Sequence, residues 1–229
     1  MQRVLKAEIL DGNDVPEELV ARAYRELTTI HRVLGDTRYV VQALRHDPLP
    51  VRRVLDIGCG RGGILADVTR ALGIEGIGID ISPPALGDAR ILKADAVHDL
   101  LPQADVAFSI HVAHHLSASG LIQMIRNVRR SCRRFIILDI VRGWVPLALF
   151  RTFVAPFVSP ITAKDGQTSI RRAYTPEEFA KLASDAVAGT NARFRHIVAP
   201  LGIRQVIDIS YSSDAQKEGN RRAPEPGES

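Results

Sequence analysis

Three glycines stand at the spacing G-x-G-x-x-G in the stretch VLDIGCGRGG, between an apolar run and an amphipathic one. They are Gly58, Gly60 and Gly63. A loop without side chains lets the backbone approach a nucleotide closely. Asp80 ends the next apolar run, twenty residues past Gly60, where a carboxylate accepts hydrogen bonds from both hydroxyls of a ribose. The spacing therefore predicts a nucleoside-binding loop.

Two further acids narrow the kind of nucleoside. Asp56 stands two residues before Gly58, where a carboxylate repels a phosphate and attracts a cation. Asp95, in KADA, ends a third apolar run and is placed to accept a hydrogen bond from an adenine amino group. No tyrosine is followed by lysine four positions later, so the pair of the short-chain dehydrogenases is missing. An NAD-dependent oxidoreductase is therefore disfavoured.

Three histidines lie close together in SIHVAHHLSASG. His111 and His115 have the i, i+4 spacing of a zinc motif, but the glutamate of H-E-x-x-H and nearby cysteines are missing, so we expect no metal. An imidazole titrates near neutrality, so His114 or His115 is a candidate catalytic base for an acidic hydroxyl. The alternative is that both only cap the next helix and line the cofactor pocket. The residues leave this choice open.

Short apolar runs and amphipathic segments alternate through the middle of the chain. Strands are predicted at 52–58, 75–80, 90–95, 104–110 and 133–140, and helices at 62–73 and 119–131. A helix at 175–186 begins with a threonine N-cap, and strands at 192–200 and 203–210 follow it. The first fifty residues are predicted to be helical, mainly at 17–35 and 37–46. This alternation predicts a parallel α/β sheet, with the three acids and the histidines at its carboxyl edge.

Composition limits the class of protein. The 229 residues are 45% apolar and 24% charged, which suits one globular domain. Two cysteines, Cys59 and Cys132, are too few for a disulfide framework, and the chain starts without a secretory leader. We therefore expect a cytoplasmic protein.

Charge and hydropathy also argue against a nucleic-acid partner and against a membrane-spanning stretch. The net charge of +4 comes mainly from arginine pairs scattered along the chain, and aromatic residues are only 5%. A nucleic-acid partner is therefore disfavoured, because binding would gather the charge into one stripe. No stretch can span a bilayer, since Asp139, Arg142 and Arg151 interrupt the most apolar region. A small-molecule substrate is expected, and the sequence indicates no oligomeric state.

Acids at three successive strand ends around a glycine loop resemble the class I S-adenosylmethionine-dependent methyltransferases over about residues 50–210. The resemblance implies a Rossmann-like seven-stranded sheet of order 3-2-1-4-5-7-6, with strand 7 antiparallel, helices on both faces and an N-terminal helical cap. We divide the chain into a cap at 1–50, a methyltransferase domain at 51–211 and a disordered tail at 212–229. A substrate-covering insertion at 141–174 belongs to the domain.

The resemblance also implies a site for S-adenosylmethionine. The implied cofactor-binding residues are Asp56, Gly58, Cys59, Gly60, Asp80, Ile81, Asp95, Ala96 and His111. The glycine loop would wrap the methionine part, and Asp56 would help to position the loop and the cofactor's ammonium group. Asp80 would hold the ribose, and Asp95 with Ala96 would face the adenine.

The insertion is expected to choose the substrate. Its apolar side chains are predicted to form one face of a helix, which would cover an apolar substrate or make a peripheral membrane contact through 144–158. The resemblance of DGQTSIRRAYTPEEF to the phenol-type bacterial branch places Asp165, Arg172 and Tyr174 at the mouth of the active site. LDIVRGW similarly gives Asp139 and Arg142 a place in the pocket floor. HRVLGDTR also resembles this branch, in which Asn more often stands at the position of His31, so the role of His31 stays open.

The sequence thus predicts an enzyme that transfers a methyl group from S-adenosylmethionine to a small, aromatic or apolar acceptor. HHL after the fourth strand resembles small-molecule methyltransferases of quinone biosynthesis and polyketide-phenol methylation. Methylation of a phenol-like oxygen is favoured. Carbon methylation of a quinone-like ring and a non-catalytic nucleoside-binding module are the alternatives.

Overall fold

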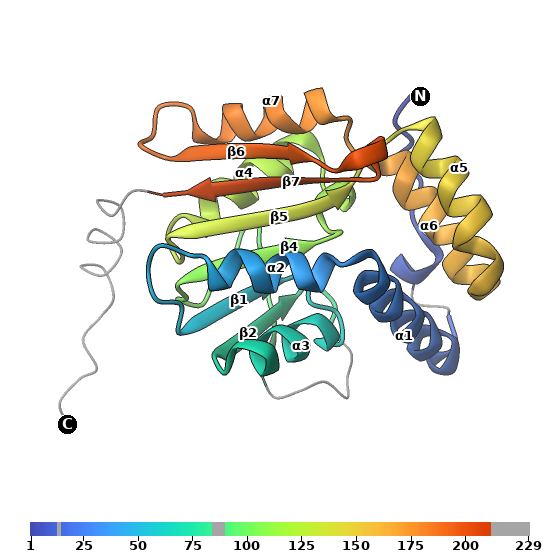
Figure 1. Cartoon of the computed structure of the whole chain (residues 1–229), viewed down its shortest axis with the longest axis horizontal. Coiled ribbons are helices and arrows are strands. Elements are labelled where there is room, and N and C mark those ends of the chain that lie inside the picture. The colour runs from blue at the N-terminus through green and yellow to red at the C-terminus, as the bar shows by residue number, and fades with distance from the viewer. Residues whose placement is uncertain (13–14, 84–89, 212–229) are drawn as a thin grey trace.

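A seven-stranded sheet forms the centre of the protein in a computed structural model that describes residues 1–12, 15–83 and 90–211 (Figure 1). The strands are β1 (Arg53–Ile57), β2 (Glu75–Asp80), β3 (Ile91–Lys93), β4 (Val106–Ile110), β5 (Arg134–Ile140), β6 (Arg193–Val198) and β7 (Arg204–Ser210). Their order is β3-β2-β1-β4-β5-β7-β6. Strands β1 to β5 pair in parallel, and β7 runs antiparallel to both β5 and β6. The predicted order and the antiparallel strand are confirmed.

Helices cover both faces of the sheet. On one face lie α2 (Asp36–Arg45) and α3 (Gly63–Leu72), and on the other lie α4 (Ala118–Val128) and α7 (Pro176–Val187) (Figure 1). Alternate residues of β5 serve the two faces, since Phe135 and Ile137 join one apolar cluster while Ile136 and Leu138 join the other. Because both faces are covered, β4 is buried along its whole length.

Three further helices gather beyond the carboxyl ends of the parallel strands. They are α1 (Glu17–Leu34), α5 (Trp144–Phe153) and α6 (Pro160–Arg172) (Figure 1). Four 3-10 turns complete the described elements: η1 (Ile9–Asp11), η2 (Ala113–His115), η3 (Ala155–Phe157) and η4 (Pro200–Gly202). Gly35 follows the last residue of α1, and its φ of 79° turns the chain directly into α2. This group of helices frames one edge of the sheet.

The insertion at 141–174 folds into α5, η3 and α6. The apolar pattern suggested a helix near α5, but the polar sequence of α6, PITAKDGQTSIRR, did not predict one. Packing against α5 explains why α6 forms. A Cβ atom on Gly166 would lie 2.2 Å from Cζ of Phe150, so the missing side chain lets the two helices approach closely. Ser159 caps α6 by accepting the N–H of Thr162.

Most of the predicted elements are present, with two differences. Residues 1–8 are not helical, although the first fifty residues were predicted to be. They run instead across the carboxyl edge of the sheet, because their polar groups bond to α6 and η2. The predicted third strand is shorter and covers Ile91–Lys93. The tail predicted at 212–229 lies outside the described residues.

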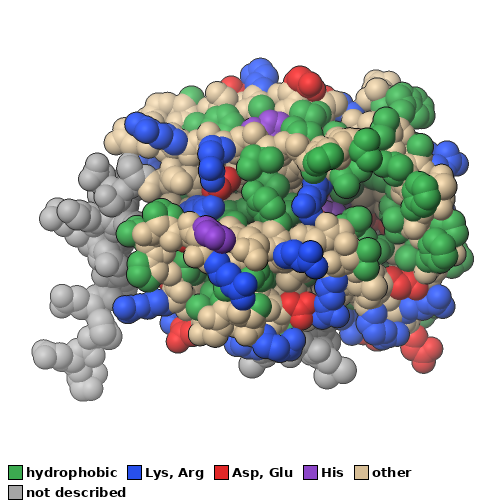
Figure 2. All heavy atoms as spheres, in the orientation of Figure 1, with side chains coloured by type: hydrophobic (Ala, Val, Ile, Leu, Met, Phe, Trp, Pro, Cys, Tyr) green, Lys and Arg blue, Asp and Glu red, His purple; other side chains and the backbone are tan. Residues whose placement is uncertain are grey.

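The surface of α5 bears on the expected membrane contact. Trp144, Phe153 and Phe157 are 67–82% exposed, and hydrophobic side chains gather over α5 in Figure 2, while Leu147 on the same helix is buried. Within the described ranges, no helix has the length and hydropathy needed to cross a bilayer. Peripheral contact through 144–158 stays a prediction.

Candidate active site

The glycine loop joins β1 to α3 at the carboxyl edge. Gly58 has a φ of 72°, in the left-handed region that favours glycine. A Cβ atom there would lie 2.4 Å from Cγ2 of Val112, in the segment that follows β4. The N–H groups of Gly58 and Cys59 donate to the carbonyl of Ile79, at 2.8 and 3.1 Å. The turn is thus fixed against β2 and requires glycine.

Two acids stand beside this loop. Asp80 accepts the N–H of Gly60 at 2.8 Å and, through its other oxygen, that of Ser82 at 2.9 Å. Asp56 is buried beneath them. Burial, and then the nearby charge of Asp80, raises the pKa of Asp56 to about 8. A proton therefore occupies Asp56 at neutral pH, and a cationic group of a ligand would replace that proton favourably.

The predicted adenine side of the site lies after β2 and β3. Asp95 binds the ring of His98 at 2.8 Å and accepts the N–H of Val97 at 2.8 Å. His98 holds the pKa of Asp95 below its usual range, so this acid is ionised. Ile81 is 67% exposed beside Asp80 and offers apolar surface to a flat ring. The carbonyl of the neighbouring Ala96 accepts the amide N–H of Asn127.

Cys59 belongs to the loop but is not a candidate nucleophile. Its Sγ atom packs against Gly78 of β2, where a Cβ atom on that glycine would lie 2.5 Å away. Burial, followed by the charges of Asp56 and Asp80, raises the pKa of the thiol. The thiol therefore stays protonated and serves as loop packing.

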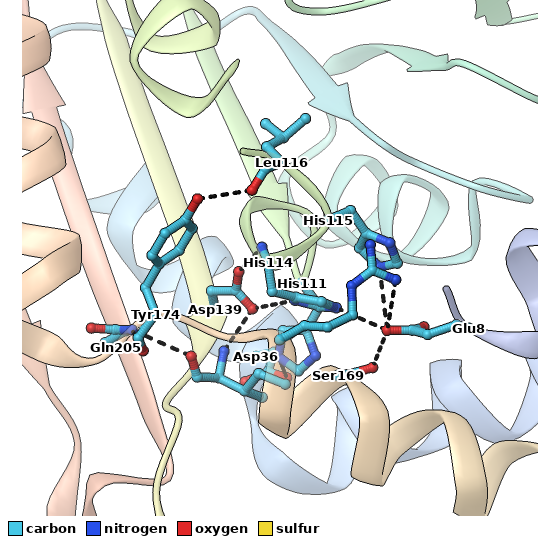
Figure 3. Close-up of polar contacts among 12 residues, drawn as sticks. Glu8, Asp36, His111, His114, His115, Leu116, Asp139, Ser169, Tyr174 and Gln205 are labelled. Atoms are coloured by element: carbon cyan, nitrogen blue, oxygen red, sulfur yellow. Dashed lines mark hydrogen bonds and ion pairs between the residues drawn. The ribbon is translucent and has the colours of Figure 1, made fainter. Parts of the chain in front are cut away.

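His114 forms a buried pair with Asp139 at the end of β5 (Figure 3). Its Nδ1 lies 2.8 Å from Asp139 Oδ1, and its backbone N–H donates to Oδ2 at 2.7 Å. Burial disfavours a charged ring, but Asp139 and then Glu8 outweigh it and raise the pKa of His114 to about 9. Helix α4 is capped by Ser117, which accepts the N–H of Gly120, so the expectation that the histidines cap this helix is wrong. Their lining of the cofactor pocket stays a prediction.

Glu8 is the residue that the sequence did not reveal. Its Oε1 lies 3.5 Å from His114 Nε2 and 3.8 Å from His115 Nε2, and it accepts the hydroxyl of Ser169 at 2.6 Å (Figure 3). Arg172 stands 3.7 Å away. Glu8 lies in a segment without periodicity or motif, so no signal in the sequence connects it to the histidines.

His111 points away from this group. Its φ of 58° turns the ring toward the corner between α1 and α2, where its centroid lies 4.5 Å from that of His31. Its Nε2 is 3.4 Å from Asp36, whose carboxylate also binds His31 at 3.0 Å and Arg204 at 2.9 Å. Burial, and then His31, lowers the pKa of His111 to about 4. A cofactor contact at His111 stays a prediction.

Two predicted substrate residues contact the first residues of the chain. Asp165, in α6, accepts the backbone N–H groups of Ile9 and Leu10 at 2.8 and 3.0 Å. Arg142 is buried and donates to the carbonyl of Met1 at 2.9 Å. It also donates to the carboxylate of Glu178 at 2.6 Å.

Tyr174 and Arg172, the other two predicted substrate residues, also contact the first residues of the chain. Tyr174 donates its hydroxyl to the carbonyl of Leu116 at 2.8 Å, and the guanidinium of Arg3 lies 3.8 Å above its ring. Arg172 stands beside Glu8, and its carbonyl accepts from Arg3 at 2.6 Å. The structure therefore brings the four predicted substrate residues together around residues 1–10.

Two groups of side chains have metal-ligating atoms within 4.8 Å of one another: Glu8 with His114 and His115, and His31 with Asp36 and His111. A guanidinium already faces each carboxylate, because Arg172 lies 3.7 Å from Glu8 and Arg204 lies 2.9 Å from Asp36. These cations oppose a metal ion electrostatically. The absence of a metal stays a prediction.

The sheet order, the glycine loop and the acids at three strand ends together define the class I S-adenosylmethionine-dependent methyltransferases. A family model described as a methyltransferase domain matches residues 22–139, more than half of the chain. The chain belongs to this family, and the predicted family is confirmed.

Curated relatives share part of the sequence. A ubiquinone biosynthesis O-methyltransferase of Methylococcus capsulatus is 32% identical over 105 residues, which cover 40% of this chain and 43% of the relative. The corresponding protein of Burkholderia thailandensis is 40% identical over 73 residues, covering 32% of this chain and 28% of the relative. The chain thus spans less than half the length of these relatives in the alignments.

Solved structures share the fold. The plantazolicin methyltransferase BpumL, in complex with SAH, superposes with a TM-score of 0.67 at 13% identity, covering 89% of this chain and 93% of that one. The mitomycin 7-O-methyltransferase MmcR superposes with a TM-score of 0.56 at 20% identity, covering 86% and 59%. At these identities the likeness concerns the fold alone.

The residues present fit S-adenosylmethionine, the cofactor of this family. A Cβ atom would fill the turn at Gly58, and the proton held on Asp56 marks a place for a cationic ammonium group. Asp80 has carboxylate lone pairs left after its two backbone bonds. The exposed Ile81 beside it suits an aromatic ring.

Proposed function

We propose that this protein methylates the oxygen of a small, aromatic or apolar molecule with a phenol-like hydroxyl. The observation that carries this proposal is the buried pair of His114 and Asp139, with a nitrogen–oxygen distance of 2.8 Å, at the same sheet edge as the glycine loop. S-adenosylmethionine, when bound, supplies the electrophilic methyl group. The acceptor oxygen must lose a proton, and His114 is the proposed base.

Charge and geometry support His114 in this role. Asp139 binds Nδ1, which leaves Nε2 to face an acceptor. The pKa of about 9 on His114 lies near the value of about 10 for a phenol, so proton transfer between them is nearly balanced. His115 lies beside it, with ring centroids 4.3 Å apart, and is more exposed. It is the second candidate base.

The two alternative functions differ in whether they need the pair of His114 and Asp139. Carbon methylation of a quinone-like ring would also begin with a phenolate, so the same histidine would serve. The printed names of the curated relatives, O-methyltransferases, favour oxygen. A nucleoside-binding module without chemistry would need the glycine loop and Asp80 but would have no use for a buried histidine–carboxylate pair.

The proposed cofactor contacts follow the strand ends. We assign the ribose to Asp80, the ammonium group to Asp56 and the adenine to Asp95 and Ala96. The loop at Gly58, Cys59 and Gly60 would wrap the methionine part, and Ile81 would pack on the base.

Calorimetric titration with S-adenosylhomocysteine tests the cofactor site. Asp80→Ala should weaken binding by about 10- to 100-fold, because hydrogen bonds to a charged group contribute about 1.5–3 kcal/mol. Asp185→Ala is the matched control, since this acid pairs with Lys181 on α7 and lies outside the proposed contacts. Equal affinity of wild type and Asp80→Ala, or binding of NADH in place of S-adenosylhomocysteine, would overturn the assignment.

His114→Gln tests the base and the acceptor together. The variant should lose turnover of phenols by about 100-fold or more, with unchanged affinity for S-adenosylhomocysteine. Mass spectrometry of the product separates oxygen from carbon methylation. Equal loss of turnover and cofactor affinity would contradict a catalytic role.

A further inference from the structure

The N-terminal segment, residues 1–10, lies across the proposed acceptor side of the active site. Arg3 donates to the carbonyls of His114 and Leu116 at 3.2 and 2.9 Å, and the N–H of Val4 donates to the carbonyl of Arg171 at 3.1 Å. The carboxylate of Asp165 holds the far end of the segment through two backbone N–H groups. These contacts carry the side chain of Glu8 into the site, where it is only 10% exposed.

Glu8 is surrounded by donors and cations. Its bond to the hydroxyl of Ser169 is 2.6 Å long, while the two histidine nitrogens and Arg172 lie 3.5–3.8 Å from Oε1. Direct hydrogen bonds between charged groups are about 2.7–2.9 Å long, so these three contacts are looser than such bonds. The surroundings of Glu8 thus favour an anion at this place.

Glu8 and an acceptor compete for one atom. Because Asp139 binds His114 Nδ1, only Nε2 can face an acceptor hydroxyl, and Glu8 stands at Nε2. An acceptor oxygen that reaches this nitrogen must therefore displace the carboxylate. The donors that remain, an imidazolium, a guanidinium and a hydroxyl, favour a replacement that is also negatively charged.

We propose that His114, His115, Ser169 and Arg172 form an oxyanion site that Glu8 occupies until an ionised acceptor oxygen, a phenolate, displaces it. This inference rests on the proposed function and names the charge state in which the acceptor binds. The exchange keeps the charge balanced, since one anion leaves as another enters beside the same cations. For an acceptor that arrives ionised, His114 is already protonated and serves as the positive partner of the phenolate. It takes a proton as the base only from an acceptor that arrives as a neutral phenol.

Methylation ends the attraction to this site. The bond between oxygen and methyl carbon forms as the bond between that carbon and the cofactor sulfur breaks, with the electron pair staying on sulfur. The acceptor oxygen thereby loses its negative charge. A neutral ether competes poorly with a carboxylate for a cationic site, so Glu8 returns and the product leaves.

Binding of 4-nitrophenol in the presence of S-adenosylhomocysteine tests the oxyanion site. This phenol is largely ionised at slightly alkaline pH, and 4-nitroanisole is its uncharged methyl ether. Glu8→Ala should bind 4-nitrophenolate at least about tenfold more tightly than wild type, and both proteins should bind 4-nitroanisole equally. Glu18→Ala, which changes an exposed acid of the same half of the chain, should bind both probes as wild type does.

A second variant guards against a folding defect. Asp165→Asn loosens the N-terminal segment without changing any of the four residues of the oxyanion site, so it should also bind 4-nitrophenolate more tightly, by a smaller factor. Benzoate serves as a carboxylate probe, and the phenolate assignment requires that it gain less than 4-nitrophenolate. An equal gain for 4-nitroanisole, no gain for 4-nitrophenolate in both variants, or a larger gain for benzoate would overturn the proposal.

Nuclear magnetic resonance of the His114 ring gives an independent readout. Asp139, Glu8, His111 and His115 face this ring, and Arg172 stands behind Glu8. Glu8→Ala should lower the pKa of His114, and bound 4-nitrophenolate should restore it. Unchanged titration in both cases would contradict the proposal. If S-adenosylhomocysteine binds but neither variant gains affinity for 4-nitrophenolate, only the oxyanion site is rejected. If wild type does not bind S-adenosylhomocysteine, the proposed function itself is rejected.

Discussion

His111 and His114 lie three positions apart on the same edge of the sheet and differ in charge. Burial disfavours a charged ring at both positions. The pKa of His114 is nevertheless raised to about 9, while that of His111 is lowered to about 4. At neutral pH the ring of His111 is therefore neutral, and the ring of His114 is an imidazolium.

The neighbours of each ring account for this difference. His114 lies between the carboxylates of Asp139 and Glu8. His111 faces Asp36, whose charge is already shared with Arg204, and packs against the ring of His31. The comparison shows that the histidines of HVAHH lie in two different environments: His114 lies between two carboxylates, and His111 packs against His31 where the N-terminal helices meet the sheet.

Asp139→Asn should produce the largest change. It leaves His114 without its principal counter-charge, so we expect turnover to fall by about 100- to 10,000-fold. The matched change on the other side, Asp36→Asn, should lower stability while turnover falls less than tenfold. Turnover as a function of pH measures both. Equal losses of turnover in the two variants would erase the distinction between the clusters.

The contributions of His114 and His111 to the free energy of unfolding should change with pH in opposite directions. The pKa of His114 is raised on folding, so its contribution is present below about pH 6.5 and is lost as pH rises through 9. The pKa of His111 is lowered, so its contribution is present above about pH 6.5 and is lost as pH falls toward 4. Each effect amounts to about 3 kcal/mol at most.

Urea unfolding across pH 4 to 9.5 measures these contributions, with wild type compared with His114→Gln and His111→Gln at each pH. The comparison cancels the titration of Asp56, whose raised pKa is common to all three proteins. His114→Gln should approach wild type in stability at high pH, and His111→Gln should do so at low pH. Parallel curves for all three proteins would contradict the opposite charge states of the two rings.

His31→Asn should have the smallest effect. Asparagine keeps a hydrogen-bond donor for Asp36 and removes the imidazole beside His111, so the free energy of unfolding should change by only about 1 kcal/mol. Turnover should stay within about threefold of wild type. A larger loss of turnover would place the His111 cluster in the chemistry and would remove the contrast with His114.

Local sequence determined much of the sheet and brought out the residues of the proposed cofactor site. The glycines at 58 and 60 and the aspartates at 56, 80 and 95 were recognisable because strand, turn and helix are set by neighbouring residues. Parallel strands then bring their carboxyl ends to one edge, so residues found by spacing come together in space. The apolar run at 133–140 likewise predicted a strand, which the structure confirms as β5.

Only the tertiary structure decided the rest. Helix α6 has a polar sequence and depends on its contact with Phe150, and Glu8 reaches His114 from more than a hundred residues away. The charges of His111 and His114 were equally hidden, although the sequence revealed both residues. The pKa of a buried ring depends on distances to groups that folding brings near, and no local pattern records those distances.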